Sequence, residues 1–391
     1  MQLIILWLIL RSVTSSFVGF VSAIRPGTII EQALPFLPPT DPLILWFERA
    51  FLSPWVRWDA EWYLRIITQG YSSTDGTAPF HPLYPWLALP LVKLGISPVL
   101  SLLIISSLAG ITLLIVLNKL MCKDLKSEDA FFGILMFTLT PQAFILFAPY
   151  PEALFLLFAV LCIYWARKKS WWLAGIAGGL AVLTRQQGLF LFLPVAWELW
   201  EDAGRKPKTV LKNWKSWLSL SLIPLGMLCW LIYRRIFVND LQINFNNLQT
   251  LIYSLFISPS ATQVVPQQQF LFPWQAISIA FRKLVLQPDI DIWVNTLGGI
   301  YFLVLFALAW RNMRVSYRIY SLVITIVSFS FFTGSFHPYM GLLRHLLLAF
   351  PVFIGLAFII KRPWIRLTII SLSALGMLFL LLLYVLKTWV P

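Results

Sequence analysis

Long apolar runs separated by short polar segments recur from one end of the chain to the other, and they restrict what it can fold into. A helix needs about 20 predominantly apolar residues to cross a bilayer. With 59% apolar and 12% charged residues, the chain has too few polar groups to cover a soluble globule. We therefore predict an all-α polytopic membrane protein. The runs that fit spanning helices are 3–23, 86–118, 130–148, 152–166, 217–237, 292–310, 317–334, 342–360 and 364–386.

The charges predict how these helices are threaded. Short cytoplasmic loops collect Lys and Arg. The run 171–200 is broken by Arg185 and has basic residues near both ends, which predicts two short helices that meet at the opposite face. About eleven helices result, with the N-terminus inside and the C-terminus outside. The basic clusters are Lys119/Lys123/Lys126, Arg167/Lys168/Lys169, Arg205/Lys206/Lys208/Lys212/Lys215, Arg311/Arg314/Arg318 and Lys361/Arg362/Arg366.

This threading explains the net charge of +14, so no nucleic-acid partner is expected. The chain is predicted to be a single membrane domain, residues 1–391, with a first outer loop at about 25–85 and a second outer region at about 238–291. A helix that lies in the membrane interface and covers a site is predicted around Trp274–Val285. The three scattered cysteines predict neither a disulfide framework nor a metal site.

The densest polar and aromatic segment lies in the first outer loop, at residues 53–70. Ser53 and Pro54 are typical of a helix start, and Gly70 of a helix end, which predicts one helix over 54–69. In such a helix Asp59 shares a face with Trp55, Trp62, Tyr63 and Ile66, while Glu61 faces away and can pair with Arg65. Alternatively, Asp59 is only the N-cap of a shorter helix that begins at Ala60.

Further charged residues lie at the ends of apolar runs. Glu152 opens a helix, where it can simply satisfy the positive end of the helix dipole. Arg185 between two apolar half-helices needs an anion or a water-filled cavity, and the anion is either a structural carboxylate or a ligand. Arg344 and His345 stand near a helix start, where a cation opposes the dipole unless an anion binds there or the side chains reach the headgroups.

Several of these segments resemble the motifs of the second GPI mannosyltransferase (PIG-V) family and its prokaryotic relatives. Arg57-Trp58-Asp59-Ala60, Phe80-His81-Pro82-Leu83-Tyr84-Pro85, Tyr150-Pro151-Glu152 and Arg185-Gln186-Gln187-Gly188 occur in the family's order, and Arg344 with Pro351 resembles its late Arg-Tyr-x-x-Pro region. The departures are His81 for a phenylalanine, Pro151 for a serine, Gln187 for an asparagine, and His345 with a longer gap to Pro351.

The resemblance implies a GT-C glycosyltransferase of the cytoplasmic membrane, active on its extracytoplasmic face. Its implied donor is a polyprenyl-phosphate mannose, its acceptor a lipid or glycan hydroxyl, and it needs no cofactor. Asp59 is carried over as the catalytic base, and a single base can suffice because the lipid phosphate leaves without protonation. Arg185, Arg344 and His345 are candidates for the donor phosphate. The further candidates for substrate binding are Arg57, Trp58, Glu61, Tyr63, His81, Tyr84, Tyr150 and Glu152.

Two alternatives remain at this point. The donor sugar can be glucose or a pentose within the same enzyme class. A lipid or solute transporter also uses broken helices and intramembrane charges, but it places them near the membrane midplane, whereas Asp59, Glu152, Arg185 and Arg344 all map to the outer side.

Overall fold

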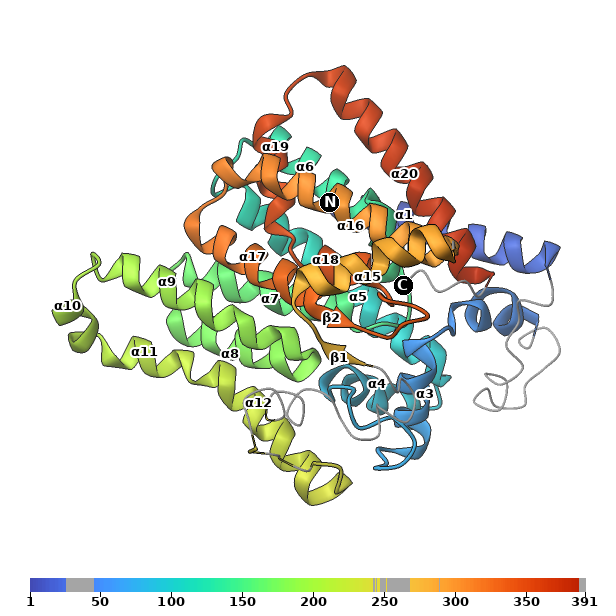
Figure 1. Cartoon of the computed structure of the whole chain (residues 1–391), viewed down its shortest axis with the longest axis horizontal. Helices are drawn as coiled ribbons and strands as arrows, with labels where there is room; N and C mark the ends of the chain where they lie inside the picture. Colours follow the sequence, from blue (N-terminus) through green and yellow to red (C-terminus); the bar gives the residue numbers. More distant parts are fainter. Residues whose placement is uncertain are drawn as a thin grey trace.

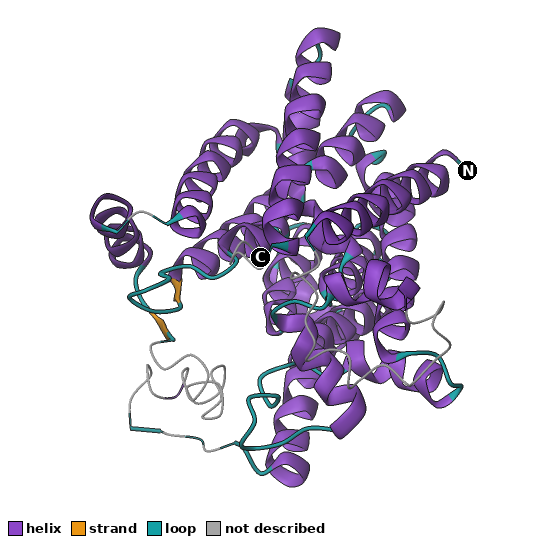
Figure 2. Cartoon of the chain, turned by 90° about the vertical axis from the view of Figure 1, so that its right-hand side faces the viewer, coloured by secondary structure: helices purple, strands orange, loops and turns teal. Residues whose placement is uncertain are grey.

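In the computed structural model the chain is a helical bundle (Figures 1 and 2). The structure describes residues 1–25, 46–241, 243, 245, 246, 251, 268–287 and 289–386, without the side chains of 210 and 211. The first half contains α1 (Gln2–Ile24), η3 (Glu48–Leu52), η4 (Ser53–Trp55), α3 (Asp59–Gln69), α4 (Leu83–Lys93), α5 (Pro98–Met121), α6 (Ser127–Leu139), η5 (Pro141–Phe147), α7 (Glu152–Ala166), α8 (Trp171–Thr184) and η6 (Gln186–Leu191).

The second half contains the remaining elements. These are α9 (Phe192–Asp202), α10 (Pro207–Lys212), α11 (Trp214–Leu220), α12 (Leu222–Tyr233), η7 (Arg234–Val238), β1 (Gln269–Phe270), α15 (Pro273–Leu286), α16 (Ile290–Ala309), η8 (Trp310–Asn312), α17 (Val315–Ser330), β2 (Phe331–Phe332), α18 (Leu342–Leu347), α19 (Pro351–Ile359) and α20 (Pro363–Val385). The strands β1 and β2 pair antiparallel, with Gln269 opposite Phe332. The helix predicted around Trp274–Val285 is confirmed as α15, whereas its place in the membrane interface stays a prediction.

Within the described part of the chain, five helices are long and apolar enough to cross a membrane, and the bent pair α6–η5 makes a sixth candidate. The long ones are Gln2–Ile24, Pro98–Met121, Trp214–Val238, Ile290–Asn312 and Pro363–Val385. Three shorter apolar helices, α7, α8 and α17, add to them. The protein is therefore an all-α polytopic membrane protein, as predicted. The count of about eleven crossings stays a prediction.

Several predicted spans are broken, and most of the breaks coincide with a proline. The run 86–118 holds parts of α4 and α5, with Ser97 capping α5 and Pro98 as its first residue. The run 130–148 bends by 82° between α6 and η5, where Pro141 follows the last residues of α6. Pro351 likewise separates α18 from α19. The predicted break at Arg185 is confirmed, since Arg185 is extended (φ −155°, ψ 143°) between α8 and η6.

The predicted continuous helix over 54–69 is wrong. Ser53–Trp55 form a 3₁₀ turn, Val56 is extended, and α3 begins only at Asp59. Trp58, the residue before α3, has a φ of 54°, outside the range of right-handed helices, so the chain cannot run as one helix from the turn into α3. Trp55 consequently does not share a helix face with Asp59.

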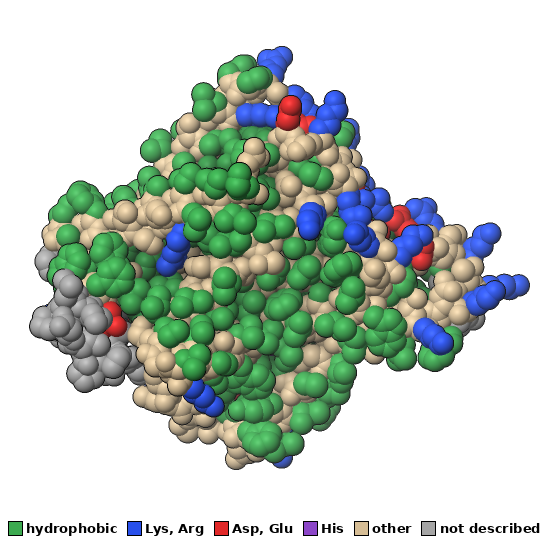
Figure 3. Space-filling model, turned by 180° about the vertical axis from the view of Figure 1, so that it is seen from behind, with side chains coloured by type: hydrophobic (Ala, Val, Ile, Leu, Met, Phe, Trp, Pro, Cys, Tyr) green, Lys and Arg blue, Asp and Glu red, His purple; other side chains and the backbone are tan. Residues whose placement is uncertain are grey.

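The basic segments meet at one end of the bundle. Arg167 pairs with Asp124 and donates a hydrogen bond to Tyr317, so three segments far apart in the sequence are joined there. Lys361 and Arg366 both pair with Asp129. In Figure 3 the Lys and Arg side chains gather along two margins of a largely hydrophobic face. Because α7 begins at Glu152 and is followed directly by Arg167, Glu152 lies at the end of the bundle opposite to this basic end.

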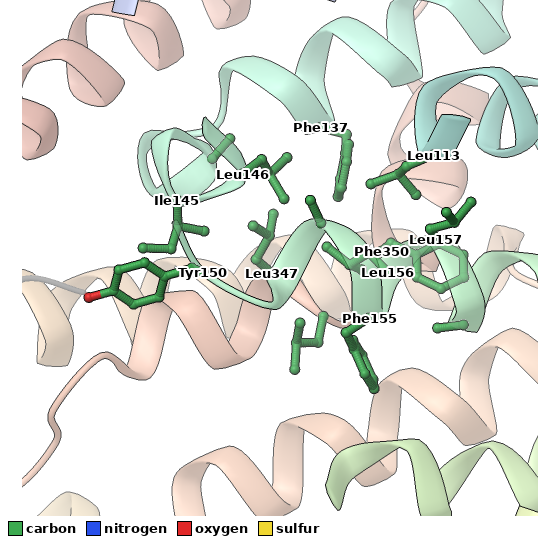
Figure 4. Close-up of a cluster of buried hydrophobic side chains, with 14 of the residues drawn as sticks. Leu113, Phe137, Ile145, Leu146, Tyr150, Phe155, Leu156, Leu157, Leu347 and Phe350 are labelled. Atoms are coloured by element: carbon green, nitrogen blue, oxygen red, sulfur yellow. The ribbon is translucent and has the colours of Figure 1, made fainter. Parts of the chain in front are cut away.

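Close helix packing holds the broken helices in place. Gly175 and Gly179 of α8 lie against α11 and α12, where an added Cβ would come within 2.1 Å of the Ser219 carbonyl oxygen and 2.7 Å of that of Leu222. These glycines are therefore helix-packing positions. Figure 4 shows the apolar cluster at the centre, to which α6, η5, α7 and α18 contribute and at whose edge Tyr150 lies.

Candidate functional site

The Asp59 side chain is directed at another helix and does not cap its own. Asp59 is the first residue of α3, and the N-cap residue Trp58 makes no side-chain capping hydrogen bond. The carboxylate oxygen Oδ2 of Asp59 accepts a hydrogen bond of 2.7 Å from the guanidinium of Arg344 on α18. The alternative in which Asp59 serves only as an N-cap is therefore not what the structure shows. Its side chain is 27% exposed, so a substrate can reach it.

Glu152 joins Arg344 to Arg185. Glu152 is the first residue of α7 and its side chain is fully buried, with the Oε1 oxygen 3.4 Å from Nε of Arg344. The same oxygen accepts a hydrogen bond from Arg185, which lies in the extended break after α8. We call Asp59, Arg344, Glu152 and Arg185 the charge network. It brings together four residues that the sequence singles out and that lie up to 285 positions apart.

The charge network has no net charge, and its side chains differ in their exposure to solvent. Two carboxylates face two guanidiniums, and the arginine side chains are 10% and 11% exposed. Buried charges are tolerated only when they are paired, because leaving water costs several kcal/mol per ion. Asp59 is the most exposed member of the network and Glu152 the least. A ligand that enters this site therefore meets Asp59 and Arg344 before Glu152.

The segment that leads into Asp59 is held by backbone hydrogen bonds. The Tyr150 hydroxyl donates to the Arg57 carbonyl at 2.8 Å, and the Tyr384 hydroxyl of α20 donates to the Trp55 carbonyl at 2.7 Å. The Arg57 guanidinium is itself buried and donates to the carbonyls of Val56, Ser53 and Val385. Burial lowers the pKa of Arg57, and nearby acidic groups, including Glu61, oppose that shift.

The other predicted substrate-binding residues surround the same segment. Tyr63 is buried with its ring edge-on to Phe80 and to Tyr84, at centroid distances of 5.3 and 5.1 Å. The Tyr84 hydroxyl hydrogen-bonds the Ser106 hydroxyl at 2.7 Å. Contact of these residues, and of Arg57, Trp58 and Glu61, with a substrate stays a prediction.

The two histidines among the candidate site residues, His81 and His345, have different surroundings. His81 lies 5.7 Å from the Trp230 ring, and burial lowers the pKa of His81 to about 3, so the imidazole is neutral at physiological pH. Its Nδ1 atom is buried without a hydrogen-bond partner among the described residues. His345 stacks on Phe331 of β2, with ring centroids 5.9 Å apart. Its predicted contact with the donor phosphate is not tested by this geometry.

Sequence reasoning missed Tyr384 and misassigned the partner of Arg11. Tyr384 lies in an apolar run without a motif, where a single phenol gives no signal beyond its polarity. Arg11 inside the apolar helix α1 invites pairing with an acid, but it donates to the Phe147 carbonyl and lies 5.3 Å from the Trp55 ring centroid. The Arg65 guanidinium, expected beside Glu61, lies 5.2 Å from the Trp62 ring centroid.

Comparison with known proteins finds a family that matches the N-terminal part of the chain. The family model described as Mannosyltransferase (PIG-V) matches residues 37–195. Over these residues the chain is similar to the PIG-V mannosyltransferase family. Three members of the charge network, Asp59, Glu152 and Arg185, fall inside the match, and Arg344 lies beyond it. The PIG-V-like protein is accordingly a membrane glycosyltransferase with a mannosyltransferase role. No curated protein and no solved structure matched this chain.

Proposed function

We propose that this PIG-V-like protein transfers mannose from a polyprenyl-phosphate mannose to a hydroxyl group of a lipid or glycan acceptor, with Asp59 as the catalytic base. The observation that carries the proposal is the partly exposed Asp59 carboxylate, held 2.7 Å from Arg344 at the accessible end of the charge network. A base and a phosphate-binding cation are the two groups that this reaction needs in one place.

The chemistry needs only one carboxylate. The acceptor hydroxyl attacks the anomeric carbon of mannose while the bond from that carbon to the phosphate oxygen breaks. The hydroxyl proton passes to Asp59, and the bonding electrons leave with the polyprenyl phosphate. Attack from the face opposite the phosphate inverts the anomeric configuration. A glycosidase needs a second carboxyl group to protonate its leaving group, whereas a phosphate leaves as an anion.

Arg344 and Arg185 are the groups proposed to hold the phosphate, whose negative charge grows as the bond breaks. Both arginines are already paired with carboxylates, so an incoming phosphate has to displace one of these carboxylates from its arginine. Asp59 is 27% exposed and Glu152 is fully buried, which makes Asp59 the exchangeable partner. Donor binding would thus occupy Arg344 and release the Asp59 oxygen that accepts the proton.

Arg344→Ala is expected to weaken donor binding about 10- to 100-fold, the value of one to two charge-assisted hydrogen bonds. Arg344→Lys should recover only part of the loss, because an ammonium group replaces a planar fork by a point charge. Binding of polyprenyl-phosphate mannose to the detergent-solubilised protein measures both. Arg65→Ala is the control, since this arginine stacks on Trp62 outside the charge network. Equal donor affinity of Arg344→Ala and the parent would contradict the phosphate role.

We further propose that the charge network faces the extracytoplasmic side of the cytoplasmic membrane. The charge network lies at the end of the bundle opposite to the basic segments. Short cytoplasmic loops are rich in Lys and Arg, so the basic end is the cytoplasmic one. A variant without Cys122, Cys162 and Cys229 allows the test, because Thr74 and Lys206 are both exposed. Thr74→Cys should react with a membrane-impermeant maleimide on intact cells, and Lys206→Cys only after lysis. The reverse pattern would place the site in the cytoplasm.

The substrate assignment is tested with purified protein and radiolabelled donors. Polyprenyl-phosphate mannose should be consumed in the presence of acceptor lipids, with label appearing in the acceptor. Polyprenyl-phosphate glucose and a pentose analogue, supplied in parallel, distinguish the donor sugar. Movement of intact donor across vesicle membranes without transfer of the sugar would instead identify a transporter.

A further inference from the structure

Trp58, which directly precedes Asp59, has a backbone conformation that few residues other than glycine adopt. Its φ is 54° and its ψ is −118°. A side chain at such a position clashes with the neighbouring backbone, and the conformation persists only where surrounding contacts hold it. Some contact must therefore fix the peptide that leads into Asp59.

Two donors hold the carbonyl of that peptide. The Arg57 carbonyl oxygen accepts hydrogen bonds from the Tyr150 hydroxyl at 2.8 Å and from the Ala60 amide at 3.1 Å. Because a peptide unit is planar, rotating this one to bring the φ of Trp58 to a negative value would turn the carbonyl away from both donors. The Tyr150 hydroxyl thus opposes the relaxation of Trp58.

Tyr150 also contacts the partner of Asp59. The Arg344 guanidinium carbon lies 5.4 Å from the centroid of the Tyr150 ring, within the range of a cation–π interaction. Tyr150 itself is fully buried, and Figure 4 shows its hydroxyl pointing away from the apolar cluster that packs around its ring. One side chain therefore contacts the backbone in front of Asp59 and the guanidinium bound to its carboxylate.

We propose that Tyr150 is a positioning residue that fixes the Asp59 carboxylate and the Arg344 guanidinium relative to each other. Its hydroxyl holds the strained peptide between Arg57 and Trp58, and its ring supports Arg344. This role replaces the substrate contact that the sequence predicts for Tyr150. The inference rests on the proposed function in so far as it gives the position of Asp59 a catalytic purpose.

The test introduces Tyr150→Phe into the parent, into Trp58→Ala and into Trp58→Gly. The phenylalanine keeps the ring and removes the hydroxyl. Both Trp58 variants lose the indole, but only glycine adopts a positive φ without strain. Tyr150→Phe should lower single-turnover mannose transfer about 10- to 100-fold in the parent and in Trp58→Ala, as expected for a misplaced reactive group. In Trp58→Gly the loss should shrink to within about threefold. Glycine adopts the positive φ without strain, so its backbone has no strain to relax when the Tyr150 hydroxyl is removed.

Tyr71→Phe is the matched control. It removes a hydrogen bond of similar length, 2.9 Å, which the Tyr71 hydroxyl donates to the Phe80 carbonyl outside the strained peptide. Its effect should be the same in all three backgrounds. Donor affinity should stay unchanged in every Tyr150→Phe variant. Weaker donor binding with Tyr150→Phe, or an equal loss of transfer in the three backgrounds, would overturn the positioning role.

The thermal midpoint in detergent supplies a readout that needs no activity. Tyr150→Phe should lower the midpoint in the parent and in Trp58→Ala by more than in Trp58→Gly. If the parent transfers no mannose, the proposed function fails, while this series still decides whether Tyr150 holds the strained peptide. A midpoint loss that is equal in the three backgrounds would overturn the inference even in an active enzyme.

Discussion

Asp59→Asn is expected to lower single-turnover mannose transfer at saturating donor by roughly 10²–10⁴-fold, the contribution of a general base. Asparagine keeps the shape of the side chain and can still accept a hydrogen bond from Arg344, but it cannot take the proton of the acceptor hydroxyl. Donor binding should persist, because Arg344 and Arg185 remain. The measurement follows radiolabelled mannose in a single turnover, alongside donor affinity and the thermal midpoint.

Asp75→Asn is the matched control for this variant. Asp75 lies between α3 and α4, where its carboxylate accepts hydrogen bonds from the amide and the hydroxyl of Thr77 outside the charge network. The same chemical change there should leave transfer within about twofold of the parent, since no proton transfer depends on it. If Asp59→Asn retains more than about a tenth of parental transfer, short of the loss of a base, Asp59 is not the base.

The sequence singles out the members of the charge network but not how they pair. Asp59, Glu152, Arg185 and Arg344 stand out because charges beside apolar runs are costly in a membrane and need a reason. Their pairing could not be read from the sequence, because it depends on how α3, α7 and α18 pack, and local spacing does not carry that information. The phosphate was predicted as the anion for Arg185, yet Glu152 already serves as a partner carboxylate, as the structural alternative had it.

The prediction of one continuous helix around Asp59 was wrong because residues distant in the sequence hold the backbone there in a non-helical conformation. Ser53-Pro54 is a sound helix start, and it does begin the short turn Ser53–Trp55. The chain then leaves the helical conformation at Val56 and Trp58, where hydrogen bonds from Tyr150 and Tyr384 hold the backbone. Nothing near Trp58 in the sequence signals a positive φ, because the contacts that impose it come from residues about 90 and 330 positions further along.

Glu152→Gln is expected to destabilise the folded protein by about 3–5 kcal/mol, the cost of leaving a buried charge without its partner. The Glu152 side chain is fully buried and is the carboxylate that Arg185 and Arg344 share, so glutamine leaves two guanidiniums facing only Asp59. Denaturant unfolding in mixed micelles measures the free energy. Asp202→Asn is the control, because Asp202 pairs with Lys169, whose side chain is 70% exposed, and losing such a pair costs about 0–1 kcal/mol.

A double variant separates the structural role of Glu152 from the role proposed for Arg185. Glu152→Leu with Arg185→Met removes one charge of each sign and fills the space with apolar groups, which is often neutral for stability. It should recover most of the free energy lost in Glu152→Gln, because Asp59 and Arg344 still balance each other. Donor affinity should nevertheless fall about 10- to 100-fold, since Arg185 no longer reaches the phosphate. A stable double variant that binds donor like the parent would limit Arg185 to neutralising Glu152.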